Sequence, residues 1–93
     1  MFEWDSEKSR LNFEKHNIAF DKATAIWQSI YLEVAAIAQE KKGETRSATI
    51  GLIDGKFYTA IWTWRSNKMR LICVRRSRDG EKKAFQNRFF QDN

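Results

Sequence analysis

One histidine and several arginines are the residues of this chain best suited to chemistry on a phosphate ester. His16 is the single histidine, and imidazole is the side chain that gains and loses a proton near neutral pH. Arg46, Arg65 and Arg75 fall in segments with strand-like composition, where an arginine is rarely placed without a task. A guanidinium stays charged, and its planar fork binds two phosphate oxygens at once.

Each of these residues also has a purely structural interpretation, which the sequence leaves open. His16 is expected at the end of a helix, where the helix dipole favours a protonated histidine. Arg46 and Glu44 share a strand face, so they could form an ion pair. Glu81 opens the last expected helix, so the dipole accounts for it too.

Positive charge is unevenly distributed along the chain. The 93 residues carry a formal net charge of +5. Residues 65–83 alone contain eight basic and two acidic side chains, a local excess of +6. Such a field attracts polyanions; the alternative is a solvated basic face without a ligand.

Other classes of site are poorly supplied with residues. Cys73 is the single cysteine, so an intramolecular disulfide is excluded, and its apolar neighbours predict a buried, inert thiol. One cysteine and one histidine also argue against a structural zinc site. Residues 1–10 are polar and charged, and no apolar run approaches the length of a membrane span. We therefore expect a cytoplasmic protein without a cofactor.

Caps and apolar spacing predict the helices. A first helix is expected from Asp5 or Ser6 to about His16, with one polar face formed by Lys8, Asn12, Lys15 and His16. Asp21 is expected to cap a second helix that ends near Ser29 or Ile30, with a core-facing stripe of Ala23, Ile26, Trp27 and Ile30. A final helix is expected from Arg78 to about Gln91, with Phe85 and Phe89 on one side.

Composition and turn signals predict four strands between these helices, at residues 31–39, 45–53, 56–65 and 69–75. Asp54-Gly55 is the strongest hairpin signal, Ser66-Asn67 is a second tight turn, and residues 40–43 read as a charged turn. Tight turns of this kind join antiparallel neighbours.

These elements predict one α+β domain over residues 1–93, with two N-terminal helices, an antiparallel four-stranded sheet and a C-terminal helix. We expect the helices to cover one face of the sheet and to leave the other free, concave and polar. Strict alternation puts Leu71, Cys73 and Arg75 on one face of the last strand, and Arg70, Ile72 and Val74 on the other.

An ordered set of short matches from Phe2 to about Phe85 resembles the BrnT family of toxins. The set consists of Phe2-Glu3-Trp4-Asp5, Lys8, Asn12, Lys15-His16, Ile18, Phe20, Ala23, Glu44, Arg46, Ile50-Gly51, Trp62-Thr63, Arg65, Arg70, Ile72, Arg75 and Glu81. Three positions depart from the family pattern, which has glycine at Asn17, Ser-Ala at Cys73-Val74 and tyrosine at Phe85. The absent hydroxyl at Phe85 puts any tyrosine role in doubt here.

The resemblance implies a RelE-like fold and a ribonuclease toxin of a type II toxin–antitoxin pair, which arrests translation by cutting RNA without a metal. It also implies a BrnA-type antitoxin that carries the DNA-binding part, in a complex of two toxins and two antitoxins. We accordingly predict catalytic roles for His16, Arg46, Arg65 and Arg75. The predicted RNA-binding residues are Lys8, Lys15, Trp62, Arg70 and Arg76.

Two other functions remain open from the residues alone. The same basic field would suit a non-catalytic RNA- or ribosome-binding module, since a single histidine is the one candidate general base. A pure interaction protein, whose exposed face holds a partner chain, is the third possibility. Trp62 likewise has two interpretations, a platform that stacks a base or a member of the core.

Overall fold

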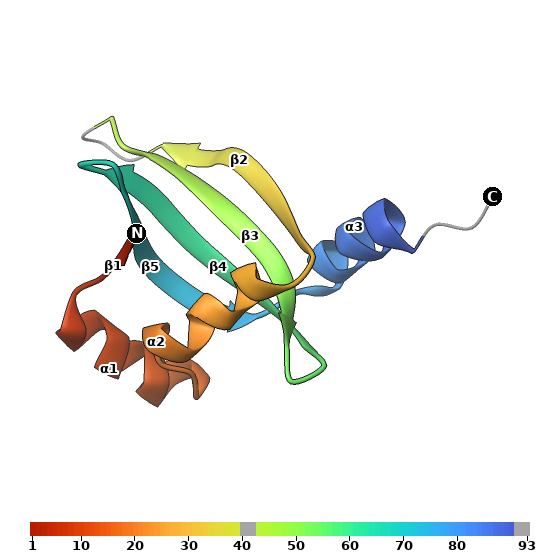
Figure 1. The fold of residues 1–93 in the computed structure, drawn as a ribbon, viewed down its shortest axis with the longest axis horizontal. Helices are drawn as coiled ribbons and strands as arrows, with labels where there is room; N and C mark the ends of the chain where they lie inside the picture. The colour runs from red at the N-terminus through yellow and green to blue at the C-terminus, as the bar shows by residue number, and fades with distance from the viewer. Residues whose placement is uncertain (40–42, 91–93) are drawn as a thin grey trace.

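The computed structural model describes residues 1–39 and 43–90, which form three α-helices, a 3-10 segment and five strands (Figure 1). In chain order the elements are β1 (Phe2–Glu3), α1 (Ser6–His16), α2 (Phe20–Ala23), η1 (Thr24–Gln28), β2 (Tyr31–Gln39), β3 (Thr45–Ile53), β4 (Lys56–Arg65), β5 (Lys68–Arg76) and α3 (Asp79–Phe89). No helix in the described ranges is both long and apolar enough to cross a membrane.

The strands form one mixed sheet of five strands in the order β1-β5-β4-β3-β2. The prediction of an antiparallel four-stranded sheet was wrong, because β1 joins the sheet parallel to β5. Phe2 pairs with Met69 and Glu3 with Arg70, and the Met69 amide donates to the Met1 carbonyl at 2.9 Å. Without β1, the backbone groups of Met69 and Arg70 at the outer edge of β5 would be unpaired. The two residues of β1 are enough to pair with them.

Turn chemistry sets the β3–β4 and β4–β5 hairpins as predicted. Asp54, Gly55, Ser66 and Asn67 all have positive φ, at 52°, 76°, 52° and 64°. Two consecutive residues with positive φ give the tight turn whose twist matches that of paired strands. Residues 40–42 of the predicted charged turn lie outside the described residues.

The second N-terminal helix differs from the prediction. It begins at Phe20 after Ala19, which makes no side-chain cap, so the assignment of Asp21 as the cap was wrong. After four residues it tightens into the 3-10 segment η1. The segment lies directly on β3, since a Cβ added at Gly51 would stand 2.8 Å from Ile26 Cγ2. Packing against the sheet therefore decides the geometry of this stretch. Ala23 and Ile26 are buried as predicted, whereas Ile30 is 45% exposed.

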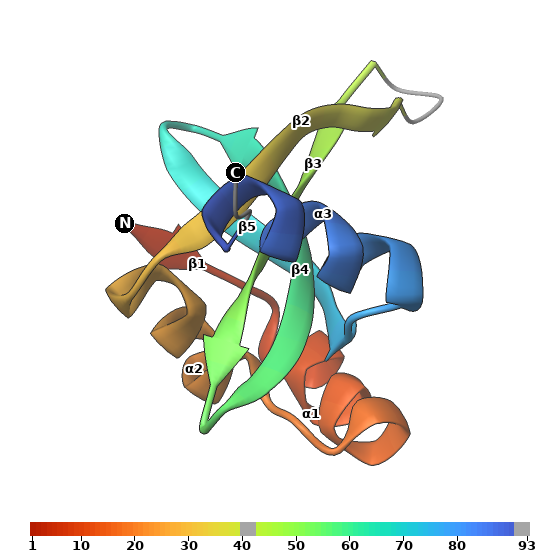
Figure 2. The same ribbon diagram turned by 90° about the vertical axis from the view of Figure 1, so that its right-hand side faces the viewer.

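Helices cover both faces of the sheet, where we expected one free face (Figure 2). One face, here called the core face, packs against α2 and η1 through Phe20, Ile26, Trp62, Leu71 and Val74. On the other, here called the α3 face, the fully buried ring of Phe85 meets Phe57 at 5.3 Å. Sequence periodicity places Phe85 on an apolar helix side but does not tell which sheet face it covers.

A bulge in β5 changes which residues share a face. Ile61 lies opposite Cys73 and Trp62 opposite Leu71, so Ile72 is an extra residue without a counterpart on β4. The predicted alternation on this strand was therefore wrong. Arg70 and Arg75 both point to the α3 face, because they lie opposite Thr63 and Thr59. Arg65 on β4 and Arg46 on β3 share that face by alternation from Thr59 and its partner Ile50.

The buried side chain of Asn12 attaches α1 to the outer edge of β5. Its Nδ2 donates to the carbonyl oxygens of Val74, at 2.9 Å, and Ile18, at 2.8 Å. Its Oδ1 accepts from the Val74 amide at 3.1 Å. The side chain thus pairs with Val74 much as a neighbouring strand would, where β1 no longer reaches.

Replacing Asn12 by alanine should destabilise the fold without changing its surface. Three hydrogen bonds would be lost and buried backbone groups left unpaired, so we expect the free energy of unfolding to fall by about 2–4 kcal/mol. Urea denaturation measures this. Asn87→Ala, the same change at an exposed position of α3, is the matched control and should stay within about 0.5 kcal/mol. An Asn12→Ala variant as stable as that control would contradict the role given to this amide.

Candidate functional site

His16 lies in a pocket beside β5, within range of the positive charge of Arg75. His16 is the last residue of α1, which Asp5 caps at its start and Asn17 ends in the left-handed conformation with φ 62°. The predicted polar face of α1 borders a pocket of about 220 Å³, lined by Lys8, Leu11, Asn12, Lys15, His16, Ile72 and Cys73. The bulge brings Ile72 into this lining. Cys73 is half-buried and lines the pocket, so the prediction of a buried thiol was wrong.

The position of His16 favours the neutral imidazole. Burial lowers its pKa below the ordinary 6.5, and the positive charges of Lys15 and Arg75 lower it further. The dipole of the helix end acts in the opposite direction and favours the protonated form. A neutral imidazole at pH 7 has a free nitrogen lone pair, so His16 is able to accept a proton.

Arg75 forms a bidentate ion pair with Glu81. Nη1 and Nη2 of Arg75 each lie 2.9 Å from one carboxylate oxygen of Glu81. The two side chains are 17% and 25% exposed. The Arg75 fork is therefore preset in direction, and a phosphate would have to share it with the carboxylate or displace that carboxylate.

Glu81 also receives hydrogen bonds from its other neighbours. Thr59 Oγ1 donates at 2.9 Å and the Arg78 amide at 2.7 Å. The hydrogen bonds from Arg75 are the first cause that lowers the pKa of Glu81 to about 2, against the opposing effect of burial, and they raise the pKa of Arg75. Glu81 is thus a permanent anion near neutral pH, which suits a residue that positions Arg75 better than one that transfers protons.

The other predicted catalytic arginines lie elsewhere on the α3 face. Arg65 forms an ion pair with Glu44, with Nη2 and Oε2 2.8 Å apart. Arg65 lies six residues along β4 from Thr59, the partner of Arg75, which at about 3.3 Å per residue separates the two arginines by roughly 20 Å. They cannot bind the same phosphate. Arg46 is half-buried on β3.

The predicted RNA-binding residues divide into three groups. Lys8 and Lys15 border the His16 pocket. Arg70, 22% exposed, contacts Glu3 at 3.3 Å. Arg76 lies opposite Tyr58, with its guanidinium 5.5 Å from the centre of that ring.

Trp62 is a core residue. It is 1% exposed, and its indole N–H donates to Thr49 Oγ1 at 2.8 Å. The exposed indole of this region is Trp64, 57% exposed, whose ring stands at 85° to that of Trp62 with the centres 5.4 Å apart. Sequence reasoning missed Trp64. The sequence showed that Trp62 and Trp64 share a face of their strand. It did not show that the core helices end before they reach the end of β4, where Trp64 lies.

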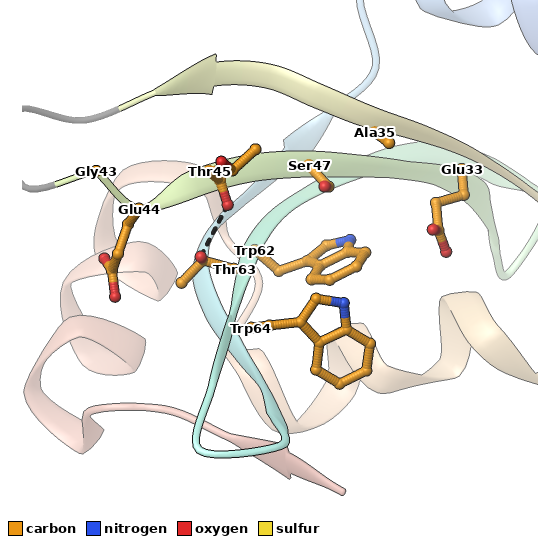
Figure 3. Close-up of a pocket in the computed structure, with 9 residues that line it drawn as sticks. All are labelled: Glu33, Ala35, Gly43, Glu44, Thr45, Ser47, Trp62, Thr63 and Trp64. Carbon is orange, nitrogen blue, oxygen red and sulfur yellow. Dashed lines mark hydrogen bonds between the residues drawn. The ribbon is translucent and has the colours of Figure 1, made fainter.

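The Trp64 groove is a second hollow, of about 510 Å³ (Figure 3). It is lined by Glu33, Ala35, Gly43, Glu44, Thr45, Ser47, Trp62, Thr63 and Trp64. Its charged residues are carboxylates, in contrast to the basic His16 pocket. Across the described ranges, no three histidine, cysteine, aspartate or glutamate side chains cluster in a way that could hold a metal ion.

A comparison with protein-family models supports the resemblance seen in the sequence. The model described as the ribonuclease toxin BrnT of type II toxin–antitoxin systems matches residues 4–81. Among curated proteins, none is significantly similar to the chain. The matched range includes the strands β2 to β5, the His16 pocket and Glu81.

The carboxylate of Glu81 should make stability depend on acid pH. Its folded pKa of about 2 lies below the ordinary value of 4.5, so its contribution is complete above pH 4.5 and is lost as the pH falls toward 2. Glu81→Gln keeps the shape but not the charge. We expect its melting temperature to lie below that of the parent at pH 7 and the difference to shrink by pH 2. A difference that stays constant from pH 7 to pH 2 would contradict the assignment.

Proposed function

The chain belongs to the BrnT family of ribonuclease toxins from type II toxin–antitoxin systems, and on this premise we propose that it cleaves RNA internally and so arrests translation. Residues 1–93 would act as one toxin domain in the cytoplasm. The observation that carries the proposal is the pocket at β5 that places His16, with its lowered pKa, beside two lysines and within range of the charge of Arg75. A base, a fixed guanidinium and phosphate-binding cations are the parts this reaction needs.

The proposed reaction uses the RNA's own 2′-hydroxyl as the nucleophile. His16 accepts its proton while the oxygen attacks the adjacent phosphorus, and the bond to the 5′-oxygen breaks. The products are a 2′,3′-cyclic phosphate and a 5′-hydroxyl, whose oxygen takes a proton from water while the protonated His16 later releases its own proton to the solvent. Arg75 stabilises the negative charge that builds up on the phosphoryl oxygens. We expect no metal to be required, because His16 supplies the base and Arg75 the charge stabilisation.

The remaining basic residues would follow the RNA backbone away from the reacting phosphate. Lys8 and Lys15, on the rim of the pocket, would bind neighbouring phosphates. Arg46, Arg65 and Arg70 share the α3 face with Arg75, so we assign them to phosphates further along the strand. Arg76 would add to the general attraction. Trp62 is not assigned to RNA, since its 1% exposure leaves almost no ring surface for a base.

An antitoxin is expected to control this activity, as the family name states for its members. We propose that it is of the BrnA type, that the complex contains two toxins and two antitoxins, and that DNA is bound through the antitoxin. The proposal follows from family membership, because a toxin of such a pair must be kept inactive in its own cell.

A non-catalytic RNA- or ribosome-binding module is the second candidate. The observation in its favour is the bidentate contact between Arg75 and Glu81, which leaves the strongest phosphate ligand of the site already occupied. Binding by the lysines would survive this arrangement, whereas charge stabilisation by Arg75 requires the guanidinium to reach the phosphate.

Cleavage of total cellular RNA by the purified chain, with EDTA present, separates the two candidates. We expect the parent to cut RNA and His16→Ala to be slower by about 10²–10⁴-fold, the usual range for lost proton transfer. The double variant Arg75→Ala with Glu81→Ala, which avoids a bare buried carboxylate, should lose about 10²–10³-fold. Arg10→Ala, an exposed arginine paired with Glu7 and Glu14, is the control.

Circular dichroism must show each variant folded for these rates to count. An intact parent that binds RNA in a salt-sensitive way but never cuts it would favour the binding module. Cleavage by the parent that persists unchanged in the folded His16→Ala variant would remove His16 from the mechanism.

The pH dependence of cleavage tests His16 as the base. The reactive form is the neutral imidazole, so activity should be lost as the pH falls through its pKa, which burial and the nearby charges place below 6.5. We expect the rate to rise with pH, with a midpoint below pH 6.5, and then to level off. Any residual rate of His16→Ala should lack this step. A midpoint clearly above 6.5 would contradict the neutral state assigned to His16.

A further inference from the structure

The Trp64 groove lies at the end of the sheet away from the core helices. Glu33 and Ala35 of β2, Thr45 and Ser47 of β3 and Trp64 of β4 contribute to its lining. Thr63 Oγ1 donates to the Thr45 carbonyl at 2.8 Å and ties the two strands together at its edge. Figure 3 shows the two indoles one above the other, with the Glu33 carboxylate projecting from β2 on the same side.

The charge of the groove is opposite to that of the chain. Glu33 and Glu44 are its charged lining residues, in a protein whose net charge is +5. Carboxylates repel a phosphate and attract a cation. Glu44 at the rim already binds the guanidinium of Arg65 at 2.8 Å. The groove therefore suits a cationic ligand and disfavours RNA.

The exposed indole of Trp64 adds a second element of cation recognition. An ammonium or guanidinium group over an indole face is attracted by the ring's quadrupole. The Trp62 ring beneath fixes the platform, because its own N–H is bound to Thr49. An aromatic surface and a carboxylate at one hollow form the combination that holds a lysine or arginine side chain.

The neighbouring strand β2 indicates what kind of chain would carry that cation. β2 is the last strand in the sheet order and pairs with β3, so its other edge is available to an extended segment. Tyr31, Val34 and Ile37 on β2 are 40%, 38% and 43% exposed. An extended partner with alternating apolar and basic residues would pair with this edge, with its apolar side chains on the face of Val34 and its basic ones on the face of Glu33.

We propose that the Trp64 groove and the edge of β2 bind an extended segment of the antitoxin, with a lysine or arginine side chain held between Trp64 and Glu33. The proposal rests on the antitoxin partner that the family implies, and not on RNA cleavage. Charge complementarity selects a basic protein segment over a nucleic acid.

A short peptide serves as the probe for this site. The intact chain is titrated with an acetylated hexapeptide of alternating valine and arginine, followed by tryptophan fluorescence, beside the same peptide with glutamate for arginine. We expect binding of the arginine peptide alone. Trp64→Ala and Glu33→Gln should each weaken it about tenfold, as for lost contacts to a charged group. Glu14→Gln, which removes one negative charge on exposed α1, should bind like the parent.

Three outcomes would overturn the proposal. Equal affinity for both peptides, or unchanged arginine-peptide affinity in Glu33→Gln, would show that the groove does not select a cation. A fall in affinity for an RNA hexamer in Trp64→Ala would make the groove a base-binding site. If Trp64→Ala does not fold, Glu33→Gln, at an exposed position, carries the test alone. The peptide titrations contain no RNA and the hexamer is used only for binding, so a failure of the cleavage mechanism leaves these results unaffected.

Discussion

The arrangement of this protein depends on how the outer edge of β5 is satisfied. β1 pairs with only two residues of that edge, and further along the side-chain amide of Asn12 takes over at Val74. The contact between Asn12 and Val74 is what attaches α1 to the edge of β5. Because Asn12 lies one helical turn before His16, the same hydrogen bonds bring the imidazole to the strand that carries Arg75. The backbone requirement of one strand thus determines where the only histidine lies.

Glu81 extends the same reasoning to α3. Its carboxylate accepts hydrogen bonds from β5, from β4 and from the start of its own helix, so α3 is fixed in position where the sheet carries its arginines. The result is a guanidinium of fixed direction beside an imidazole kept neutral by burial and positive charge. Fixed charges of this kind act without reorganisation when charge develops on a substrate.

Local signals in the sequence predicted the hairpins, the β3 and β4 bounds and the polar face of α1, because turn residues with positive φ and helix caps act over a few residues. Features that depend on distant segments were not predictable. The bulge at Ile72 arises from the pairing of two strands, and it moved Arg70 to the face of Arg75 against strict alternation. Packing likewise determines the two-residue β1 and the 3-10 geometry of η1 over Gly51. It also determines that Trp62 is buried and Trp64 exposed. The resemblance identified the family, yet it could not show that Arg65 and Arg75 lie too far apart to share a phosphate.

The His16 pocket and the Trp64 groove have opposite chemistry, and this bears on how a toxin could be controlled. The His16 pocket is rimmed by lysines and suits an anion, whereas the Trp64 groove presents carboxylates and an indole and suits a cation. A basic partner segment in the groove would therefore not compete with RNA for the same side chains. It would compete with Arg65 for Glu44, and it would bring its own chain along β2 at the far side of the sheet from β5. Inhibition by such a partner would then require either that the rest of the partner covers the α3 face or that its bulk excludes a long RNA. Because the acidic groove and the basic pocket are separate, the partner can bind the groove tightly without carrying negative charges that imitate those of RNA.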